Sequence, residues 1–453
     1  MLHGTHSLKS SGPRGSFLLG NLTQFGQDPL GFLEFCAREH GDFVALRFIN
    51  RPVYILNSPE HIDFVLASHS RIFRKTLGYR TPFMRRLFGQ GLLTSEGEFW
   101  MRQRKLAQPA FHRDRIASHA EVIVAFTRRM TASWRGGETR DIHLDMMRLT
   151  TEVVTKTLFN SAVPKEINEL GEASAVVMER FTKQWQWYRI LFNLLPESIT
   201  QPRYEQVMRR LDAFIYGLIA EHRASGRDEG DLLSMLLRAR GEDGSQMTDQ
   251  QLRDELTTLM VAGLDTTALA LSWACYLLSQ NPDVQKKLEN EIDATLGNRA
   301  ANIADLPRLP YTEMVIKETM RLYPSAWIIG REAIQDFELA GHAIKAGSSM
   351  LLSQWLKHRD ERYFKSAEKF VPERWGSEET NTLPKFAYFP FGGGPRVCVG
   401  SSFAMMEAIL ALATITQQFR LTAQPNYVIK PFAAITLQPL GGVNLKVEKR
   451  ERA

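Results

Sequence analysis

One apolar segment limits the possible folds of this chain more than any other feature. Residues Thr248–Gln280 have the length and repeat of a single long helix, with a capping box between Thr248 and Gln251 and a stop at Asn281-Pro282. The middle of the segment is apolar on nearly every face, which is typical of a helix in the core of a large protein. We exclude a membrane span, because Asp265 lies at its centre and charged residues crowd its start.

The rest of the chain predicts a mainly α protein with a smaller β part, an α+β fold. At about 1.5 Å per residue the long helix spans roughly 50 Å, enough to cross the whole molecule. Two alternating runs, Phe43–Phe48 and Pro52–Asn57, predict a β-hairpin, and strand-like runs return after residue 324, at Ala434–Leu437 and Val443–Val447. The β-rich part covers roughly residues 40–60 and segments after 324, and the helical body roughly residues 60–323 and 400–419. Since no linker or repeat divides the chain, we predict a single catalytic domain over residues 1–453.

Composition and charge narrow the class of protein. Three cysteines in 453 residues favour a reducing compartment over a disulfide scaffold. The N-terminal segment has no apolar cluster longer than Phe17–Leu19, so we expect no membrane anchor and a cytoplasmic protein. The net charge of +6 is not gathered in a dense basic run with interleaved aromatic residues, so we expect no nucleic-acid partner. A basic face for an acidic protein and an ordinary solvated surface are the two interpretations of this charge.

A glycine-rich loop near the C-terminus, FPFGGGPRVCVG (Phe389–Gly400), contains Cys398. Its spacing does not match a dinucleotide fingerprint, a phosphate P-loop or a thiol phosphatase, and Cys36 and Cys275 are too scattered to form a zinc site with it. The next segment, Gly400–Phe419, predicts a helix whose N-terminus would stabilise a thiolate at Cys398. A rigidly held thiolate suits ligation of haem iron; the alternative is a buried free cysteine, which we expect for Cys36 and Cys275.

Five positions of this loop form the pattern F-x-x-G-x-R-x-C-x-G, which resembles the signature of the cytochrome P450 family of haem-thiolate monooxygenases: Phe391, Gly394, Arg396, Cys398 and Gly400. Further segments that resemble motifs of this family occur in order and extend the resemblance over nearly the whole chain. They are Trp100 with Arg104, the segment AGLDTT at Ala262–Thr267, Glu318 with Arg321, and FVPERW, which contains Arg374. The resemblance implies the P450 fold, with the long central helix over a haem and the cysteine loop beneath it.

The segment AGLDTT lies within the long helix and resembles the oxygen-activation segment of the family. Gly263 has no side chain, so a ligand can approach the backbone closely there. The hydroxyl of Thr266 can bond to the carbonyl four residues back or release it and admit water and dioxygen, and Asp265 is a candidate buried proton source. Taken alone, the hexapeptide also fits a satisfied polar kink in a core helix.

The resemblance also implies the cofactor and its support. Haem b is the expected cofactor, with no bound flavin, and Cys398 is the expected iron ligand. The two propionates of a haem need cationic and N–H donors around them, because burying unpaired carboxylates is costly. The residues expected to contact the haem are Trp100, Arg104, Ala262, Gly263, Arg331, Pro390, Phe391, Gly392, Arg396, Cys398 and Gly400. Glu318, Arg321 and Arg374 are expected to form a buried network that supports the cysteine loop.

By resemblance, the chain is a soluble bacterial-type monooxygenase in which Thr266 and Asp265 relay protons to dioxygen and Cys398 is the axial ligand. Since only a short stretch follows Cys398, we expect no fused reductase domain, and a ferredoxin or flavodoxin with its NAD(P)H reductase is the expected electron source. A peroxide-dependent peroxygenase and a non-catalytic haem-binding sensor are the alternatives. Apolar residues at two variable segments predict a lipophilic substrate, a fatty acid, terpenoid or steroid: Phe83, Met84, Leu87, Phe88, Trp327 and Ile328.

Overall fold

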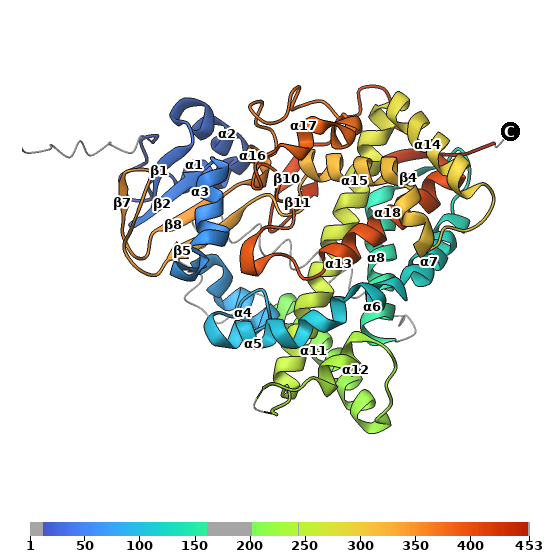
Figure 1. Cartoon of the computed structure of the whole chain (residues 1–453), viewed down its shortest axis with the longest axis horizontal. Coiled ribbons are helices and arrows are strands. Elements are labelled where there is room, and N and C mark those ends of the chain that lie inside the picture. Colours follow the sequence, from blue (N-terminus) through green and yellow to red (C-terminus); the bar gives the residue numbers. More distant parts are fainter. Residues whose placement is uncertain (1–11, 161–201, 243, 452–453) are drawn as a thin grey trace, which may run out of the picture.

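A computed structural model describes residues 12–160, 202–242 and 244–451. A β-rich part lies at one side of the molecule and a larger helical part at the other, with the helix α13 (Asp249–Gln280) running between them (Figure 1). The prediction of a mainly α fold with a smaller β part is confirmed.

The largest sheet gathers strands from three distant parts of the chain in the order β1-β2-β8-β5-β3. The predicted hairpin is its edge: Phe43 stands opposite Leu56 across an antiparallel pair, and β2 then pairs in parallel with β8. These strands are β1 (Phe43–Phe48), β2 (Arg51–Leu56), β3 (Phe73–Lys75), β5 (Ile329–Ala333) and β8 (Ser349–Leu352).

Three smaller sheets complete the β structure, and the three-stranded one packs into the helical part of the molecule (Figure 1). They consist of β4 (Thr139–Asp141), β12 (Asn444–Lys449) and β9 (Phe419–Thr422); of β10 (Pro431–Ala433) and β11 (Leu437–Pro439); and of β6 (Phe337–Leu339) and β7 (His342–Ile344). The strand predicted at Ala434–Leu437 is wrong in position, because Ala434 N donates to the carbonyls of Phe432 and Thr436, each at 3.1 Å, and forms a turn between β10 and β11. This turn has apolar residues because it is buried against the helical part; Ala434 is 3% exposed.

The α-helices form the body of the molecule, and α13 has the bounds that its sequence predicts. Thr248 is its N-cap, in a complete capping box with Gln251. Among the described residues α13 is the one helix long and apolar enough to cross a membrane, but 78% of its apolar window is buried inside the protein. The helices are α1 (Leu22–Gln27), α2 (Pro29–His40), α3 (Pro59–Asp63), α4 (Pro82–Phe88), α5 (Gly97–Ala107), α6 (Arg113–Ala117), α7 (Ala120–Ala132), α8 (Ile142–Phe159), α11 (Pro202–Ser225), α12 (Leu232–Arg238), α13 (Asp249–Gln280), α14 (Pro282–Leu296), α15 (Pro310–Leu322), α16 (Gln354–Lys357), α17 (Glu378–Asn381) and α18 (Ser401–Gln418).

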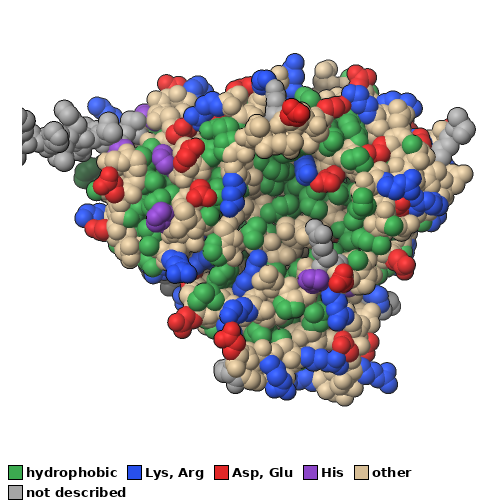
Figure 2. All heavy atoms as spheres, in the orientation of Figure 1, with side chains coloured by type: hydrophobic (Ala, Val, Ile, Leu, Met, Phe, Trp, Pro, Cys, Tyr) green, Lys and Arg blue, Asp and Glu red, His purple; other side chains and the backbone are tan. Residues whose placement is uncertain are grey.

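Two apolar clusters surround α13 and place its middle at the candidate site. The C-terminal half of α13 packs with α7, α8, α14, α15 and α18 in the largest cluster. Its N-terminal half packs with α4, α8, α11 and α12 in a second cluster. Between the two, the segment that contains Gly263 and Thr266 borders a cavity that extends to Cys398, just before α18. On the face drawn in Figure 2, hydrophobic side chains gather in a central hollow between the β-rich part and the helices.

Candidate active site

The glycines of the cysteine loop are required by close contacts. Gly394 has a φ of +64°, and a Cβ there would lie 1.8 Å from the carbonyl oxygen of Leu66. A Cβ on Gly393 would lie 2.3 Å from the ring of Phe386. The backbone N–H of Cys398 donates to the carbonyl of Phe391 at 3.0 Å, which closes the loop. The loop is therefore a rigid support that fixes the cysteine at the start of α18.

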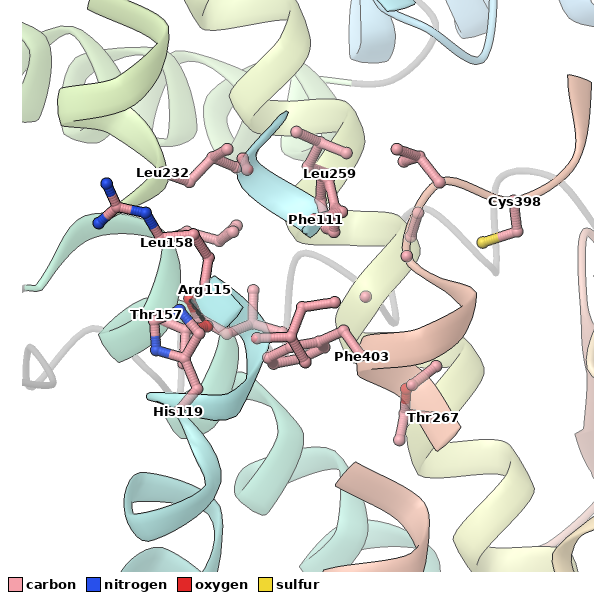
Figure 3. A pocket seen from close by; sticks show the side chains of 18 of the residues that line it. Phe111, Arg115, His119, Thr157, Leu158, Leu232, Leu259, Thr267, Cys398 and Phe403 are labelled. Atoms are coloured by element: carbon pink, nitrogen blue, oxygen red, sulfur yellow. Dashed lines mark hydrogen bonds between the residues drawn. The ribbon is translucent and has the colours of Figure 1, made fainter. Parts of the chain in front are cut away.

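Cys398 is exposed on the side where it lines the cavity, while neighbouring protein atoms desolvate its thiol (Figure 3). Burial raises the pKa of this thiol, while the backbone N–H of Gly400 and the guanidinium of Arg104 act in the opposite direction. The helix N-terminus thus assists the thiolate as the sequence predicts, but burial outweighs it. A cation at the sulfur would favour the thiolate, because a metal ion deprotonates a thiol that coordinates it.

Along the cavity, α13 presents the small residues Ala262 and Gly263 and the hydroxyl-bearing residues Thr266 and Thr267. Thr266 Oγ1 donates to the carbonyl of Ala262 at 2.7 Å, the bond that the sequence predicts four residues back. The carbonyl of Thr266 also accepts a hydrogen bond from Ser325 Oγ at 2.8 Å. Gly263 leaves the helix backbone open to the cavity, with Val154 beside it. A ligand in the cavity can therefore approach both the backbone and the Thr266 hydroxyl.

The cavity contains about 860 Å³ of empty space, including its opening to solvent. Its body is apolar, whereas Arg115, His119 and Thr157 lie together at the end away from Cys398 (Figure 3). Such a mainly apolar chamber with few polar groups is typical of a site for a lipophilic small molecule. The other lining residues are Ala110, Phe111, Ile116, Val154, Leu158, Gly230, Leu232, Met235, Leu259, Ala262, Gly263, Thr266, Thr267, Val399, Gly400, Phe403 and Ala404.

Asp265 does not line this cavity, unlike its neighbour Thr266. Its side chain is 3% exposed and accepts hydrogen bonds from Thr436 Oγ1 at 2.7 Å and from Gln438 Nε2 at 3.2 Å. Burial raises the pKa of Asp265, and Thr436, Gln438 and His143 oppose this effect in that order. The sequence identifies Asp265 as a buried acid, but only the structure identifies its partners.

Four residues that the family resemblance assigns to the haem propionates lie in different environments: Trp100, Arg104, Arg331 and Arg396. Arg331 is 8% exposed, and the only hydrogen bond of its side chain among the described residues goes to the carbonyl of Gly330, at 2.9 Å. Burial lowers the pKa of both Arg331 and Arg104, and neither forms an ion pair within the described part of the chain. A buried cation, Arg331, and a half-buried one, Arg104, both without a carboxylate partner, fit a cofactor that brings its own carboxylates.

The remaining two residues of this set contact each other. The guanidinium of Arg396 lies 5.2 Å from the ring centroid of Trp100, in cation–π contact. Arg396 also forms an ion pair with Glu96, through a 2.8 Å bond from Nη1 to Oε1. Arg396 therefore already has an acidic partner, which the sequence did not predict. The loop residues Pro390, Phe391 and Gly392 line a second hollow together with Met320 and Met405 of α15 and α18.

The network expected for Glu318, Arg321 and Arg374 is present in the structure. Arg321 donates from Nε and Nη2 to the two oxygens of Glu318, each at 2.9 Å, and neither side chain has exposed surface. Arg374 Nε donates to Glu318 at 2.9 Å, and so does Trp375 Nε1. The backbone N–H of Val371 adds a fifth bond to Glu318, at 3.0 Å. One fully buried carboxylate thus joins α15 to the segment 371–375.

His358 connects this network to the cysteine loop, and the sequence analysis missed it. Arg321 Nη1 donates to the carbonyl of His358 at 2.8 Å, and His358 Nε2 accepts the backbone N–H of Phe389 at 2.9 Å, at the start of the loop. An accepting Nε2 requires a neutral ring, and burial, followed by the charge of Arg321, holds the pKa of His358 well below its usual value. Nothing in the segment LKHRD marks this role.

None of the six residues predicted to contact substrate lines the cavity that reaches Cys398. Phe83, Met84, Leu87 and Phe88 are at most 4% exposed, because α4 turns this face into the second apolar cluster. Trp327 is 5% exposed and donates from Nε1 to the carbonyl of Ala434. Ile328 packs against an apolar cluster that α2 forms with β1 and β2. In sequence, an apolar helical stripe has the same pattern whether it faces a core or a pocket.

Comparison with known proteins places this geometry in one family. The family model described as "Cytochrome P450" matches residues 11–443. The chain is similar to "Cyclooctatin synthase" of Streptomyces melanosporofaciens, with 36% identity over 428 residues, which covers 94% of this chain and 92% of the relative. It is 35% identical to "Cyclooctat-9-en-7-ol 5-monooxygenase" of the same organism, over 90% of this chain and 88% of the relative. It is 31% identical to "Pentalenene oxygenase" of Streptomyces avermitilis, over 96% of each chain.

Proposed function

The chain belongs to the cytochrome P450 family, and we propose that it is a haem b monooxygenase that hydroxylates a terpenoid with electrons from a separate redox protein. The observation that carries this proposal is the apolar cavity, which extends from the thiol of Cys398 to the hydroxyl of Thr266. Members of this family bind haem iron through a cysteine thiolate and use dioxygen, a lipophilic substrate and a redox partner.

The residues around the cavity divide the tasks of such an enzyme. Bound haem supplies a dioxygen-binding iron whose thiolate ligand favours O–O cleavage. Cys398 is the proposed ligand, and Arg104 and Arg331 are the proposed partners of the propionates, because neither cation has an ion pair in the described part of the chain and burial lowers the pKa of both. Ala262 has a short side chain and Gly263 has none, so dioxygen and substrate can lie close to the backbone of α13.

We assign the control of protons to Thr266 and Asp265. The Thr266 hydroxyl borders the cavity and bonds to the Ala262 carbonyl, a bond that it can exchange for a water molecule or for reduced dioxygen. Asp265 is the proposed proton donor on the other side of the same helix turn, in a buried environment that raises its pKa. Thr266 would orient a water molecule that carries protons from this side to a ligand in the cavity.

A terpenoid is the proposed substrate class among the lipophilic alternatives. The cavity wall is built mainly from aliphatic and aromatic side chains, with Leu232, Met235 and Leu259 in its body. The names of two relatives refer to cyclooctat-9-en-7-ol and to pentalenene. Arg115 and His119, at the far end of the cavity, could donate hydrogen bonds to an oxygen atom already present on the substrate. A fatty acid or a steroid would be an alternative outcome of the substrate test.

A ferredoxin or flavodoxin with its reductase is the proposed electron source. Of the basic residues near α5, Lys105 is paired with Glu242 at 2.9 Å and Arg102 donates to Ser245 at 2.6 Å. Arg115 is exposed at the cavity opening, and the side chain of Arg113 lies outside the described part of the structure. The basic face is therefore partly neutralised by this chain's own groups, and we propose only a weak electrostatic attraction for an acidic partner.

The test is turnover with a surrogate ferredoxin system and a panel that contains a cyclic terpene, a fatty acid and a steroid. Substrate binding is measured by the spin-state change of the haem, and coupling by the product formed per NADPH. Thr266→Ala should reduce this ratio by about tenfold or more and raise the peroxide yield, because positioned proton transfer contributes typically 10²–10⁴-fold to rate. Thr266→Ser is the matched control and should retain most of the coupling.

The outcomes separate the proposal from its alternatives. If hydrogen peroxide alone supports product formation, and if the rate with NADPH and the ferredoxin system is no higher than the rate with peroxide, the protein would be a peroxygenase. Haem binding without any oxidation of the panel and without NADPH consumption would indicate a sensor. Unchanged coupling in Thr266→Ala would show that this hydroxyl only kinks the helix.

A further inference from the structure

The polar partners of Asp265 come from the β10–β11 hairpin, far away in sequence. Thr436 Oγ1 donates to Asp265 Oδ2 at 2.7 Å, and Gln438 Nε2 lies 3.2 Å from Oδ1. Gln438 Nε2 also donates to Thr436 Oγ1 at 2.8 Å, so the three side chains form a closed hydrogen-bonded group. Asp265 and Thr436 are 3% and 7% exposed, while Gln438 is half-buried at the edge of the hairpin.

The hairpin cannot move away from Asp265 without breaking contacts on both of its sides. Trp273 Nε1, on α13, donates to the carbonyl of Leu437 at 3.0 Å. The N–H of Leu437 donates to the carbonyl of Ser325, also at 3.0 Å. Ser325 Oγ in turn donates to the carbonyl of Thr266 at 2.8 Å. One set of contacts therefore fixes the backbone of Thr266 and the side chain of Asp265 together.

Charged groups are scarce around Asp265. It forms no ion pair with any residue of the described ranges, and His143 is the titratable group whose charge acts on it. His143 lies on α8, beside Asp141, and its Nδ1 is 3.1 Å from Ser272 Oγ. The hairpin contributes only the neutral Thr436 and Gln438. In this part of the protein, neutral donors hold the acid in place.

We propose that Thr436 and Gln438 are positioning residues that set the proton affinity of Asp265 and keep its carboxyl group on the hairpin side of α13. This inference rests on the proposed function, since it assigns a role within proton delivery. When Asp265 gives up its proton, the O–H bond of the carboxyl group breaks and a water molecule takes up the proton, forming a new O–H bond; that water passes one of its own protons on toward the cavity, so no net charge stays on the water. The carboxylate that remains is stabilised by the two donated hydrogen bonds until a proton from solvent restores the acid.

The direction of the effect follows from which form the donors stabilise. Both the hydroxyl and the amide donate to Asp265, so they favour its ionised form and oppose the effect of burial. Loss of the Thr436 hydroxyl should therefore raise the pH at which Asp265 ionises. Loss of a hydrogen bond to a charged carboxylate typically corresponds to an upward pKa shift of about one unit or more.

The experiment compares Thr436→Val, which keeps the shape but removes the donor, with Thr436→Ser, which retains a hydroxyl. The first measurement needs no turnover: the infrared band of the protonated carboxyl group is titrated in the resting protein and assigned by its loss in Asp265→Asn. Thr436→Val should shift its midpoint upward by about one pH unit or more, Gln438→Leu should shift it less, and Thr436→Ser should restore the wild-type value. An equal midpoint in wild type and Thr436→Val would overturn the proposal, as would equal midpoints for the Val and Ser variants.

The second measurement is the pH profile of product formed per NADPH, which should shift by the same amount and in the same direction as the infrared midpoint. A lower rate in Thr436→Val with an unshifted profile would mean a merely structural role and would contradict the proposal. The infrared titration remains informative if no substrate is turned over. Failure of the proposed function, seen as absent turnover in wild type, is therefore distinguishable from failure of this inference.

Discussion

Replacement of Glu318 by Gln should be among the most destabilising isosteric changes in this chain. The side chain is fully buried and accepts five hydrogen bonds, three of them from Arg321 and Arg374. Glu318→Gln keeps the shape but removes the charge, so the two guanidinium groups lose their carboxylate. Breaking a buried ion pair on one side typically costs about 3–5 kcal/mol. That is a large part of the roughly 5–15 kcal/mol by which proteins are stable.

Urea unfolding, followed by far-UV circular dichroism, measures this loss as a lower midpoint at an unchanged slope. Arg374→Ala should cost less than Glu318→Gln, about 1–3 kcal/mol, because Glu318 keeps Arg321 as a partner. Asp336→Asn is the matched control: its partner Lys345 is 2.7 Å away, but both side chains are exposed, so stability should stay within experimental error. A loss in Glu318→Gln no larger than in the control would refute the argument that burial makes this network important.

Two further predictions concern the cysteine loop and the histidine that supports it. Cys398→His should abolish the red-shifted Soret band of the ferrous carbonyl complex, because that band requires a thiolate ligand. The control is Cys36→Ala, in the N-terminal core, which should retain the band. Survival of the band in Cys398→His would exclude Cys398 as the ligand. Because the pKa of His358 is lowered in the folded protein, the unfolded chain binds a proton at His358 more tightly than the folded protein does. The contribution of neutral His358 to the free energy of unfolding is therefore fully present above about pH 6.5. It is lost as the pH falls below that value, at up to about 1.4 kcal/mol per pH unit. Urea titrations from pH 7 to pH 5 should show a shallower acid slope in His358→Gln, and a slope identical to wild type would contradict the assignment.

The sequence by itself determined those parts of the protein that local patterns specify. The long helix α13 follows from its apolar content and its capping box, and the β1–β2 hairpin follows from two alternating runs. The cysteine loop is recognisable because five residues at fixed spacing within ten positions match the pattern of the family. In each case the information lies within a few adjacent residues.

Only the tertiary structure decided which distant groups meet these elements. The sequence shows that Asp265 is an acid in an apolar helix, but Thr436, 171 positions further along the chain, becomes its partner only after the chain has folded back. His358 connects Arg321 to the cysteine loop through a backbone carbonyl, and backbone groups carry no sequence signal. The apolar stripe of α4 could equally face a pocket or a core, and the packing of α11 and α13 against it decided for the core. Hydrogen bonds and packing contacts depend on distance in space, and the pattern of a single segment does not encode that distance.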